Sequence, residues 1–223
     1  MNKVQSIRKA CEINDKIFLE ITRNFRFKTE RDLEKYILKR FRQEGAGRAY
    51  RPIVANNNSV IHAKPRDKRF SSGFLVLDFG CKFNGWCSDM TRTIFIGKAG
   101  EEEKKLYNLV LSCQEKCIKK VREGVFCCEL DIYSRTLLKE KAQYFKHALG
   151  HGVGKKVHEK PRVSPWSPDV LKEGQVITIE PGIYIKKGKK EFGIRVEDTL
   201  LVNSNGCEVF CKASKKFIEI KLR

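Results

Sequence analysis

The stretch FLVLDFGCKFNGWCSDMTRTIFIG, residues 74–97, contains two apolar runs on either side of an Asn-Gly pair at positions 84 and 85. Apolar runs around Asn-Gly predict two antiparallel strands joined by a tight turn. Each run carries one aspartate, Asp78 in LVLDFG and Asp89 in CSDMTRT, eleven residues apart. A carboxylate inside a buried strand is unfavourable unless a partner offsets its charge, so both acids indicate a functional site.

Three later segments also place an ionisable side chain in an apolar or glycine-rich run. ALGHGVG carries His151, VITIEPG carries Glu180 and IRVEDT carries Glu197. Together with the two aspartates they make four carboxylates and one imidazole, without a matching number of buried cations. Such a set can hold two adjacent divalent ions, with two of the carboxylates bridging them.

Helical patterns precede the strands in each half of the chain. Apolar residues at helical spacing predict a helix over 2–23. Thr29 and Asp32 resemble a capping box that opens a second helix, which we expect to end near position 43. In the second half, the same spacing predicts helices over 101–122 and 129–145.

The two halves therefore repeat one plan, in which two helices are followed by strands that carry two carboxylates. Asp78 and Glu180 lie 102 residues apart, and Asp89 and Glu197 lie 108 apart. Two copies with little residue identity are not a tandem solenoid. We expect an α+β domain with pseudo-twofold symmetry and the metal site at its centre.

The order Asp, Asp, His, Glu, Glu within these flanking words resembles the two-metal pita-bread aminopeptidases, which include methionine aminopeptidase, Xaa-Pro aminopeptidase and prolidase. The resemblance extends over roughly residues 7–209. It implies a pita-bread fold in a single catalytic domain over 1–223, with halves at about 1–98 and 99–223. Because Xaa-Pro enzymes usually carry a separate N-terminal domain and this sequence starts almost at the first catalytic helix, we expect the catalytic domain only.

The resemblance assigns a role to each of the five residues. Asp78 would bind one ion, and His151 with Glu180 would bind the other. Asp89 and Glu197 would bridge the two ions, which would share a hydroxide as the nucleophile. Glu180 is also the expected proton shuttle, because a carboxylate beside the hydroxide can pass its proton to the leaving amine. Oxygen-rich ligation with one imidazole favours Mn²⁺ and tolerates Co²⁺, Fe²⁺ or Zn²⁺.

The other three histidines of the chain have expected places near the substrate. His158, in KKVHEKP, matches the family histidine that contacts the scissile carbonyl and its developing oxyanion. His62, in SVIHAKP, matches the histidine that lies over the substrate near the scissile nitrogen. His147, four residues before His151, is either a substrate contact or a structural histidine.

Three further residues lie beside the expected ligands, and two of them help to choose among family members. His147 in HALGHGVG and Arg195 in IRVED resemble the Xaa-Pro enzymes more than methionine aminopeptidases. On a strand, Arg195 faces the same side as Glu197, two residues on. Thr178 likewise shares a face with Glu180 and can hydrogen-bond a ligand.

We therefore expect a metal-dependent aminopeptidase that cleaves after the N-terminal residue and prefers Xaa-Pro peptides. The alternative enzyme is a methionine aminopeptidase. A non-catalytic member of the fold that binds peptides or nucleic acid is a further alternative, but such members typically lose ligands, and all five are present here. The resemblance also allows a homodimer.

The formal net charge of +19 raises the question of a nucleic-acid partner. The lysines are scattered along the chain, no basic stripe interleaved with aromatic residues occurs, and no nucleic-acid-binding motif is visible. We therefore expect a solvated basic surface rather than a nucleic-acid partner.

The nine cysteines and the absence of targeting signals bear on location. Nine is an odd number and no C-x-x-C occurs, which favours reduced thiols in the cytoplasm. The pairs Cys113/Cys117 and Cys207/Cys211 each step by four, so an additional zinc site is a minor alternative. No secretory signal is visible, and no run of about 18 apolar residues predicts a membrane span.

Overall fold

Two amphipathic helices precede the first strands, as predicted. The computed structural model describes residues 1–221. Helix α1 (Lys3–Arg23) and helix α2 (Glu30–Gln43) bury their apolar faces in one hydrophobic cluster. The predicted capping box of α2 is confirmed, because Thr29 and Asp32 each accept a hydrogen bond from the other's backbone nitrogen.

The strands of the first half divide between a large sheet and a small one. They are β1 (Gly47–Arg48), β2 (Ile53–Asn56), β3 (Gly73–Asp78), β4 (Cys81–Phe83), β5 (Trp86–Cys87) and β6 (Met90–Ile96). The predicted turn joins β4 to β5, and both of its residues, Asn84 and Gly85, have positive φ angles, of 49° and 80°. The stretch 74–97 forms four strands rather than two, because the chain leaves the large sheet after Asp78 and returns to it at Met90.

The second half repeats the order of helices before strands. Its elements are α3 (Glu101–Ile118), α4 (Cys127–Leu138), the 3-10 helix η1 (Lys139–Tyr144), β7 (Gly150–Gly152), β8 (Glu159–Val163), β9 (Val176–Ile179), β10 (Gly182–Lys187), β11 (Lys190–Arg195), β12 (Glu197–Asn203), β13 (Gly206–Val209) and β14 (Glu219–Ile220).

Both predicted helices of this half had wrong boundaries. The helix predicted over 101–122 ends at Ile118, because the nitrogens of Lys120 and Val121 bond to carbonyls only three residues back. The helix predicted over 129–145 begins two residues earlier and ends at Leu138. Lys139 has a φ of 51°, outside the α-helical region, so the α-helix stops before it and the chain continues as η1.

One nine-stranded sheet joins the halves. Seven of its strands follow the order β2-β3-β6-β12-β9-β7-β8, while β13 pairs with β12 and β14 pairs with β6. The halves meet where β6 and β12 run antiparallel, with Thr91 opposite Glu197. Beside this junction the buried side chains of Arg92 and Asp198 form an ion pair of 2.7 Å. Strands β10 and β11 form a separate hairpin.

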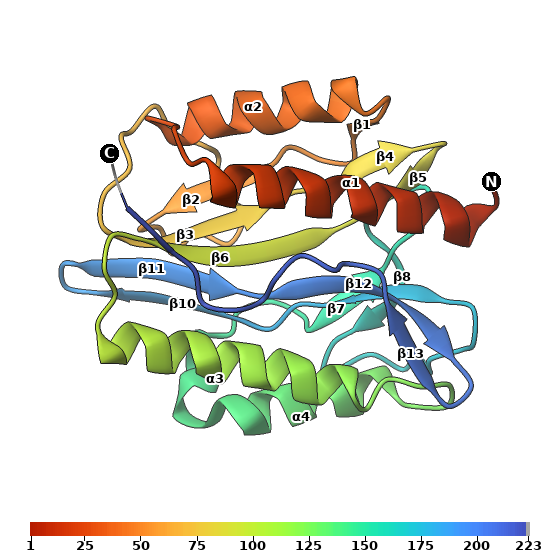
Figure 1. Cartoon of the computed structure of the whole chain (residues 1–223). Coiled ribbons are helices and arrows are strands. Elements are labelled where there is room, and N and C mark those ends of the chain that lie inside the picture. Colours follow the sequence, from red (N-terminus) through yellow and green to blue (C-terminus); the bar gives the residue numbers. More distant parts are fainter. Residues whose placement is uncertain (222–223) are drawn as a thin grey trace.

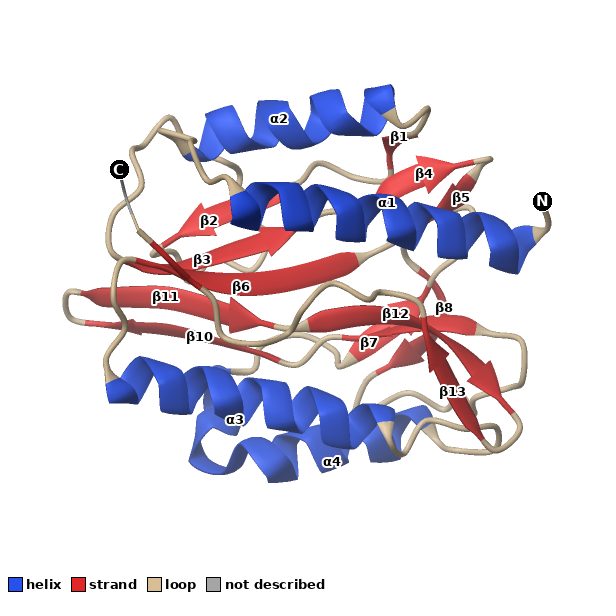
Figure 2. Ribbon diagram, viewed as in Figure 1, coloured by secondary structure: helices blue, strands red, loops and turns tan. Residues whose placement is uncertain are grey.

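Each half contributes one pair of helices to the same layered arrangement. Figure 1 shows α1 and α2 along the strands of the first half and α3 and α4 along those of the second. In Figure 2 the strands form a central layer between the two helix pairs. Each helix pair packs in its own hydrophobic cluster, so the predicted α+β class is confirmed.

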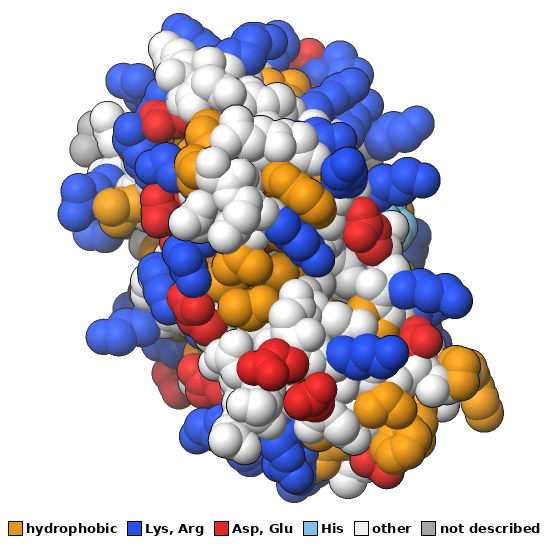
Figure 3. Space-filling model, turned by 90° about the vertical axis from the view of Figure 1, so that its right-hand side faces the viewer, with side chains coloured by type: hydrophobic (Ala, Val, Ile, Leu, Met, Phe, Trp, Pro, Cys, Tyr) orange, Lys and Arg blue, Asp and Glu red, His pale blue; other side chains and the backbone are white. Residues whose placement is uncertain are grey.

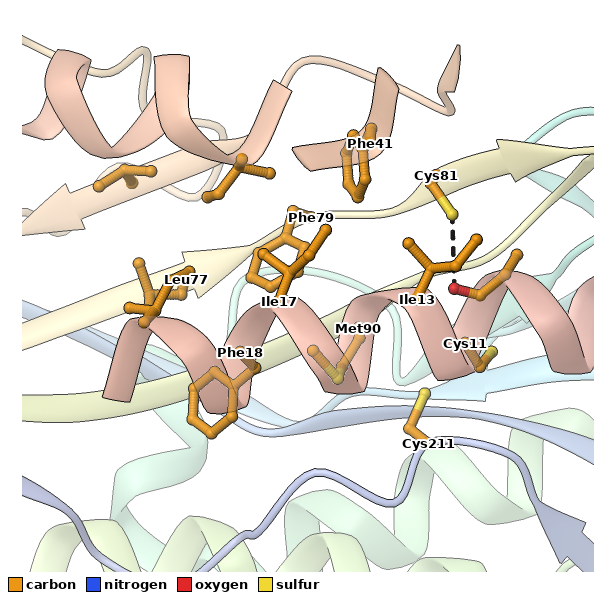
Figure 4. Close-up of a cluster of buried hydrophobic side chains, with 14 of the residues drawn as sticks. Cys11, Ile13, Ile17, Phe18, Phe41, Leu77, Phe79, Cys81, Met90 and Cys211 are labelled. Carbon is orange, nitrogen blue, oxygen red and sulfur yellow. Dashed lines mark hydrogen bonds between the residues drawn. The ribbon is translucent and has the colours of Figure 1, made fainter. Parts of the chain in front are cut away.

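The cysteines contribute to the core as thiols. All nine are free, and seven of them are buried, as expected for a reducing environment. Figure 4 shows Cys11 and Cys211 facing each other beneath α1, and Cys81 beside the Ala10 carbonyl oxygen, 3.4 Å from its Sγ. Within residues 1–221, no group of potential metal ligands includes a cysteine, so the additional zinc site gains no support.

The surface is strongly basic but not uniformly so. On the face shown in Figure 3, lysine and arginine side chains are interrupted by acidic and apolar ones. None of the helices in residues 1–221 has the length and apolar character needed to cross a lipid bilayer.

Candidate metal centre

The five residues predicted as ligands converge where the halves of the sheet meet. Each lies at or next to a strand: Asp78 ends β3, Asp89 precedes β6, His151 lies in β7, Glu180 follows β9 and Glu197 begins β12. All five line one cleft of about 620 Å³.

The potential ligand atoms form three overlapping groups, each within 4.8 Å. The groups are Asp78, Asp89 and Glu197; His151, Glu180 and Glu197; and Asp89, His151 and His158. Asp89, His151 and Glu197 each belong to two groups. Overlap of this kind suits a pair of neighbouring ions, because a bridging residue must reach both.

Strand register brings two of the acids to the same level of the sheet. Asp78 on β3 and Glu197 on β12 are both paired with Thr91 on β6. The Thr91 hydroxyl donates to Glu197 Oε2 at 2.6 Å and accepts from Arg195 Nε at 3.0 Å. The other oxygen of Glu197, Oε1, is buried and has no hydrogen-bond partner within residues 1–221. Such an oxygen is suited to ligate a cation.

The acids of the cleft make each other difficult to ionise. Burial, followed by the charge of Asp78, raises the pKa of Asp89 to about 8. Burial and the charge of Asp89 raise the pKa of Glu197 well above its ordinary value. Arg195 is the one guanidinium that pairs with these four carboxylates in the described chain, through Asp78. The donor set therefore fits divalent cations, which would offset the remaining negative charge.

His151 and Glu180 form a close pair on the second half of the site. His151 Nε2 lies 3.3 Å from Glu180 Oε1. Burial disfavours both charged forms, but their mutual contact raises the pKa of His151 to about 9 and lowers that of Glu180 to about 2. Thr178 hydrogen-bonds both residues, since its hydroxyl accepts from the His151 nitrogen at 3.1 Å and donates to Glu180 at 3.4 Å.

The glycine before His151 is required by the close approach of β7 to β9. A Cβ atom at Gly150 would lie 2.0 Å from the carbonyl oxygen of Thr178. No other residue fits such a gap. The glycine in the ALGHGVG segment therefore allows His151 to lie against β9, the strand that ends just before Glu180.

The three remaining histidines all line the cleft, but only His147 has hydrogen-bond partners for its ring within residues 1–221. Its Nδ1 lies 2.8 Å from the Ala148 carbonyl oxygen and its Nε2 lies 2.9 Å from the Tyr184 hydroxyl. Burial lowers the pKa of His147 to about 4, so the imidazole is neutral. His158 is exposed, with its ring 4.3 Å from that of His151, and His62 is exposed at the edge of the cleft.

Two tyrosines at the site were not predicted. The Tyr50 hydroxyl contacts Asp78 and Asp89 together, and burial followed by the charge of Asp78 raises its pKa well above 10. The Tyr184 hydroxyl accepts from Arg195 and lies beside His147. Arg195, predicted to face the site with Glu197, thus connects Asp78 to Tyr184.

We expect the metal-free protein to lose stability as the pH rises from about 4 to about 8. Asp89 ionises near 3.8 when unfolded but near 8 when folded, so the folded state binds more protons in this window. More protons on the folded state mean that the free energy of unfolding falls with pH. His151, with a raised pKa, acts in the same direction above its ordinary value of 6.5.

Thermal unfolding of chelator-treated protein between pH 5 and 8 measures this slope. Asp89→Asn is the control, because it removes one of the titrating groups and should make the decrease of stability with pH less steep. A melting temperature of the wild type that does not change with pH would contradict the assignment of these shifts.

Comparisons with known proteins agree with this geometry. The family model described as metallopeptidase family M24 matches residues 5–204. The Xaa-Pro dipeptidase of Pyrococcus horikoshii is 39% identical over 226 residues, which cover 97% of this chain and 63% of that protein. The chain therefore spans less than two thirds of the length of that relative.

Solved structures show the same fold. The prolidase of Pyrococcus horikoshii OT3 superposes with a TM-score of 0.91 at 37% identity, covering 97% of this chain and 63% of that one. The X-Pro aminopeptidase of Thermotoga maritima MSB8 gives 0.92 at 34% identity, covering 98% and 63%. The predicted pita-bread fold is thus confirmed, and the chain belongs to metallopeptidase family M24.

Proposed function

We propose that this chain hydrolyses the peptide bond after the N-terminal residue of peptides whose second residue is proline, with two divalent ions, most favourably Mn²⁺. The observation that supports it most is the convergence of potential ligand atoms in three overlapping groups at one cleft. In this proposal the five ligands are Asp78, Asp89, His151, Glu180 and Glu197. The relatives named Xaa-Pro dipeptidase and X-Pro aminopeptidase support the substrate class.

The ligands and their neighbours divide the chemistry between them. Bound divalent ions would polarise the scissile carbonyl and lower the pKa of a water molecule. Glu180, whose pKa of about 2 keeps it ionised, would accept a proton from that water and deliver it to the leaving nitrogen. Glu180 Oε2 lies 3.8 Å from His147 Nδ1, so the carboxylate is close to a second residue that lines the cleft.

The two exposed histidines are placed to handle the substrate. Partial desolvation of the His158 ring, followed by the charge of His151, lowers the pKa of His158, so a neutral imidazole would donate a hydrogen bond to the developing oxyanion. His62 also lines the cleft, and we assign it to the scissile nitrogen. His147 and Arg195 both contact the Tyr184 hydroxyl, and in this proposal the three side chains form part of the wall of the cleft.

Proline in the second position fits the chemistry of this cleft. Its nitrogen has no proton, so the enzyme must supply the one that the leaving group needs. The residues that line the cleft also include apolar side chains, among them Ile53, Ile61 and Val157, that suit a pyrrolidine ring.

The remaining assignments extend the same proposal. We assign residues 1–223 to one catalytic domain, with halves that divide near position 98, just before α3. The free thiols support a reducing compartment such as the cytoplasm. A homodimer is compatible with the proposal, and the +19 charge is assigned to the solvated surface rather than to nucleic acid.

A peptide panel tests the substrate assignment. Mn²⁺-loaded protein should cleave Ala-Pro and Ala-Pro-Ala, and a comparison of their kcat/KM values separates dipeptidase from aminopeptidase behaviour. We expect Ala-Pro-Ala to exceed Met-Ala-Ser, since discrimination is a difference in transition-state binding. A tenfold or greater preference for Met-Ala-Ser would replace the Xaa-Pro assignment with that of a methionine aminopeptidase.

A further inference from the structure

The position of His62 is determined by the loop that carries it. Within residues 1–221 no hydrogen bond or ion pair holds its imidazole, which is exposed at the cleft. The loop covers residues 57–72 between β2 and β3 and contains no helix or named strand, only an isolated bridge between Arg69 and Thr29. Whatever fixes the backbone of this loop therefore fixes His62.

The far end of the loop has a strong anchor within the first half. Glu30, which is 1% exposed, accepts from Arg66 Nη2 at 2.6 Å, from the Arg66 nitrogen at 2.7 Å and from the Asn56 nitrogen at 2.9 Å. Ala63 is buried in a small apolar cluster with residues of β2 and β3. These contacts hold the loop after His62 to the body of the first half.

The near end of the loop is held by a residue of the other half. Glu191, on β11, accepts from the Ser59 hydroxyl at 3.0 Å and from the Ser59 nitrogen at 3.3 Å. The hydrogen bond from the Ser59 backbone lowers the pKa of Glu191, which keeps it an ionised acceptor. The β10–β11 hairpin, which reaches the left end of the molecule in Figure 1, also approaches the loop at Gly193 and Asn58.

We infer that Glu191 is a positioning residue: by holding Ser59, it sets the backbone that presents His62 to the substrate. The inference rests on the proposed function, in which His62 contacts the substrate. Ser59 is three residues from His62, so release of this anchor leaves His62 between a free segment and the fixed Ala63. The second half of the molecule carries His151 and Glu180, the proposed ligands of one ion. It would thus also align His62, a substrate-contacting residue of the first half.

The contact is suited to mutation because Glu191 is partly exposed. Its side chain is 34% exposed, and Lys186 Nζ lies 3.9 Å from its carboxylate. Arg66 is held by the buried Glu30, and this ion pair does not include Glu191. Glu191→Ala should therefore leave the melting temperature and the metal content near those of the wild type.

The experiment compares Glu191→Ala with two controls. Glu191→Ala should lower kcat/KM for Ala-Pro-Ala roughly tenfold, because a small misplacement of a contacting group is costly. Glu191→Gln keeps an acceptor oxygen for Ser59 and should restore activity to within about twofold of the wild type. Glu102→Ala removes a carboxylate that contacts the same hairpin, 3.2 Å from Lys190, but not the loop, and should have no effect.

A double-mutant cycle shows whether Glu191 acts through His62. If it does, Glu191→Ala should cost nothing further in a His62→Ala background. An equal loss in both backgrounds would overturn the inference, as would wild-type kcat/KM in Glu191→Ala.

Hydrogen exchange separates this inference from the proposed function. Amides 59–62 should exchange faster in Glu191→Ala than in Glu102→Ala, whatever the substrate. If the wild type cleaves no Xaa-Pro peptide but amides 59–62 exchange faster in Glu191→Ala, only the proposed function is overturned. Unchanged exchange in Glu191→Ala overturns the positioning role.

Discussion

Replacing Asp89 by alanine is expected to abolish detectable peptidase activity and to lower the content of bound divalent ions. Asp89 belongs to two of the three ligand groups, and its Oδ2 lies 3.6 Å from His151 Nε2. Its loss therefore removes an oxygen from both candidate ion positions at once. Metal content by mass spectrometry and kcat/KM for Ala-Pro-Ala, measured on the same preparation, check this result.

Thr178→Ala is the matched control at the same site. Thr178 is fully buried and hydrogen-bonds His151 and Glu180, two of the proposed ligands, without being a proposed ligand itself. Loss of such a contact typically costs about 10- to 100-fold, so the variant should keep measurable activity. Equal effects of the two substitutions, or a fully active Asp89→Ala protein, would contradict the assignment of Asp89.

Chelation of the wild type should reproduce the activity loss and also lower the melting temperature. Ions that bind only the folded protein stabilise it by about 2.7 kcal/mol at a hundredfold excess over Kd. Without ions the carboxylates repel each other, as the raised pKa values of Asp89 and Glu197 indicate. Full activity in metal-free protein would end the metallopeptidase proposal.

The five candidate ligands could be selected from sequence because each lies in a local pattern of its own. A strand places alternate residues on one face, so Thr178 with Glu180 could be placed without knowing how the strands pair. Convergence of the five residues could be expected only through the family resemblance. In the structure it depends on the pairing of β3 and β12 with β6, which joins residues more than a hundred positions apart.

The two tyrosines that were not predicted, Tyr50 and Tyr184, reach the site only through contacts between residues distant in the sequence. Tyr50 lies in GRAYRP, which has no strand or helix period. It reaches Asp78 and Asp89 because the Ala49 nitrogen bonds to the Gly80 carbonyl oxygen at 3.0 Å, beside the point where the chain leaves the large sheet. Tyr184 follows Glu180 by four residues in an apolar strand, where an aromatic residue ordinarily indicates core packing.

Helix ends were predicted less well than helix positions. The start of α2 was predicted correctly because its capping box consists of two residues only three positions apart in the sequence. The end of α4 is determined by the backbone of Lys139, which has a positive φ angle. No residue pattern in the sequence predicts that angle. Propensity alone favoured continuation through KEKAQY, which instead forms the 3-10 helix η1.

His158→Ala is expected to lower kcat roughly 10²- to 10³-fold, the usual cost of losing one donor to a developing oxyanion. His158 lies at the open side of the cleft, exposed, with its ring 4.3 Å from that of His151. The same position allows a second role, because its imidazole belongs to one ligand group with Asp89 and His151. Activity alone cannot separate the two roles, since either would reduce kcat.

Metal content separates them. An oxyanion donor can be removed while two ions remain bound, so the variant should keep wild-type stoichiometry and the wild-type rise in melting temperature with Mn²⁺. His151→Ala, which removes an assigned ligand, provides the contrast and should lose metal. If His158→Ala lost metal while His151→Ala retained it, the two histidines would exchange roles. The imidazole nearer to Glu180 would then support the oxyanion, and the exposed one would complete the metal site.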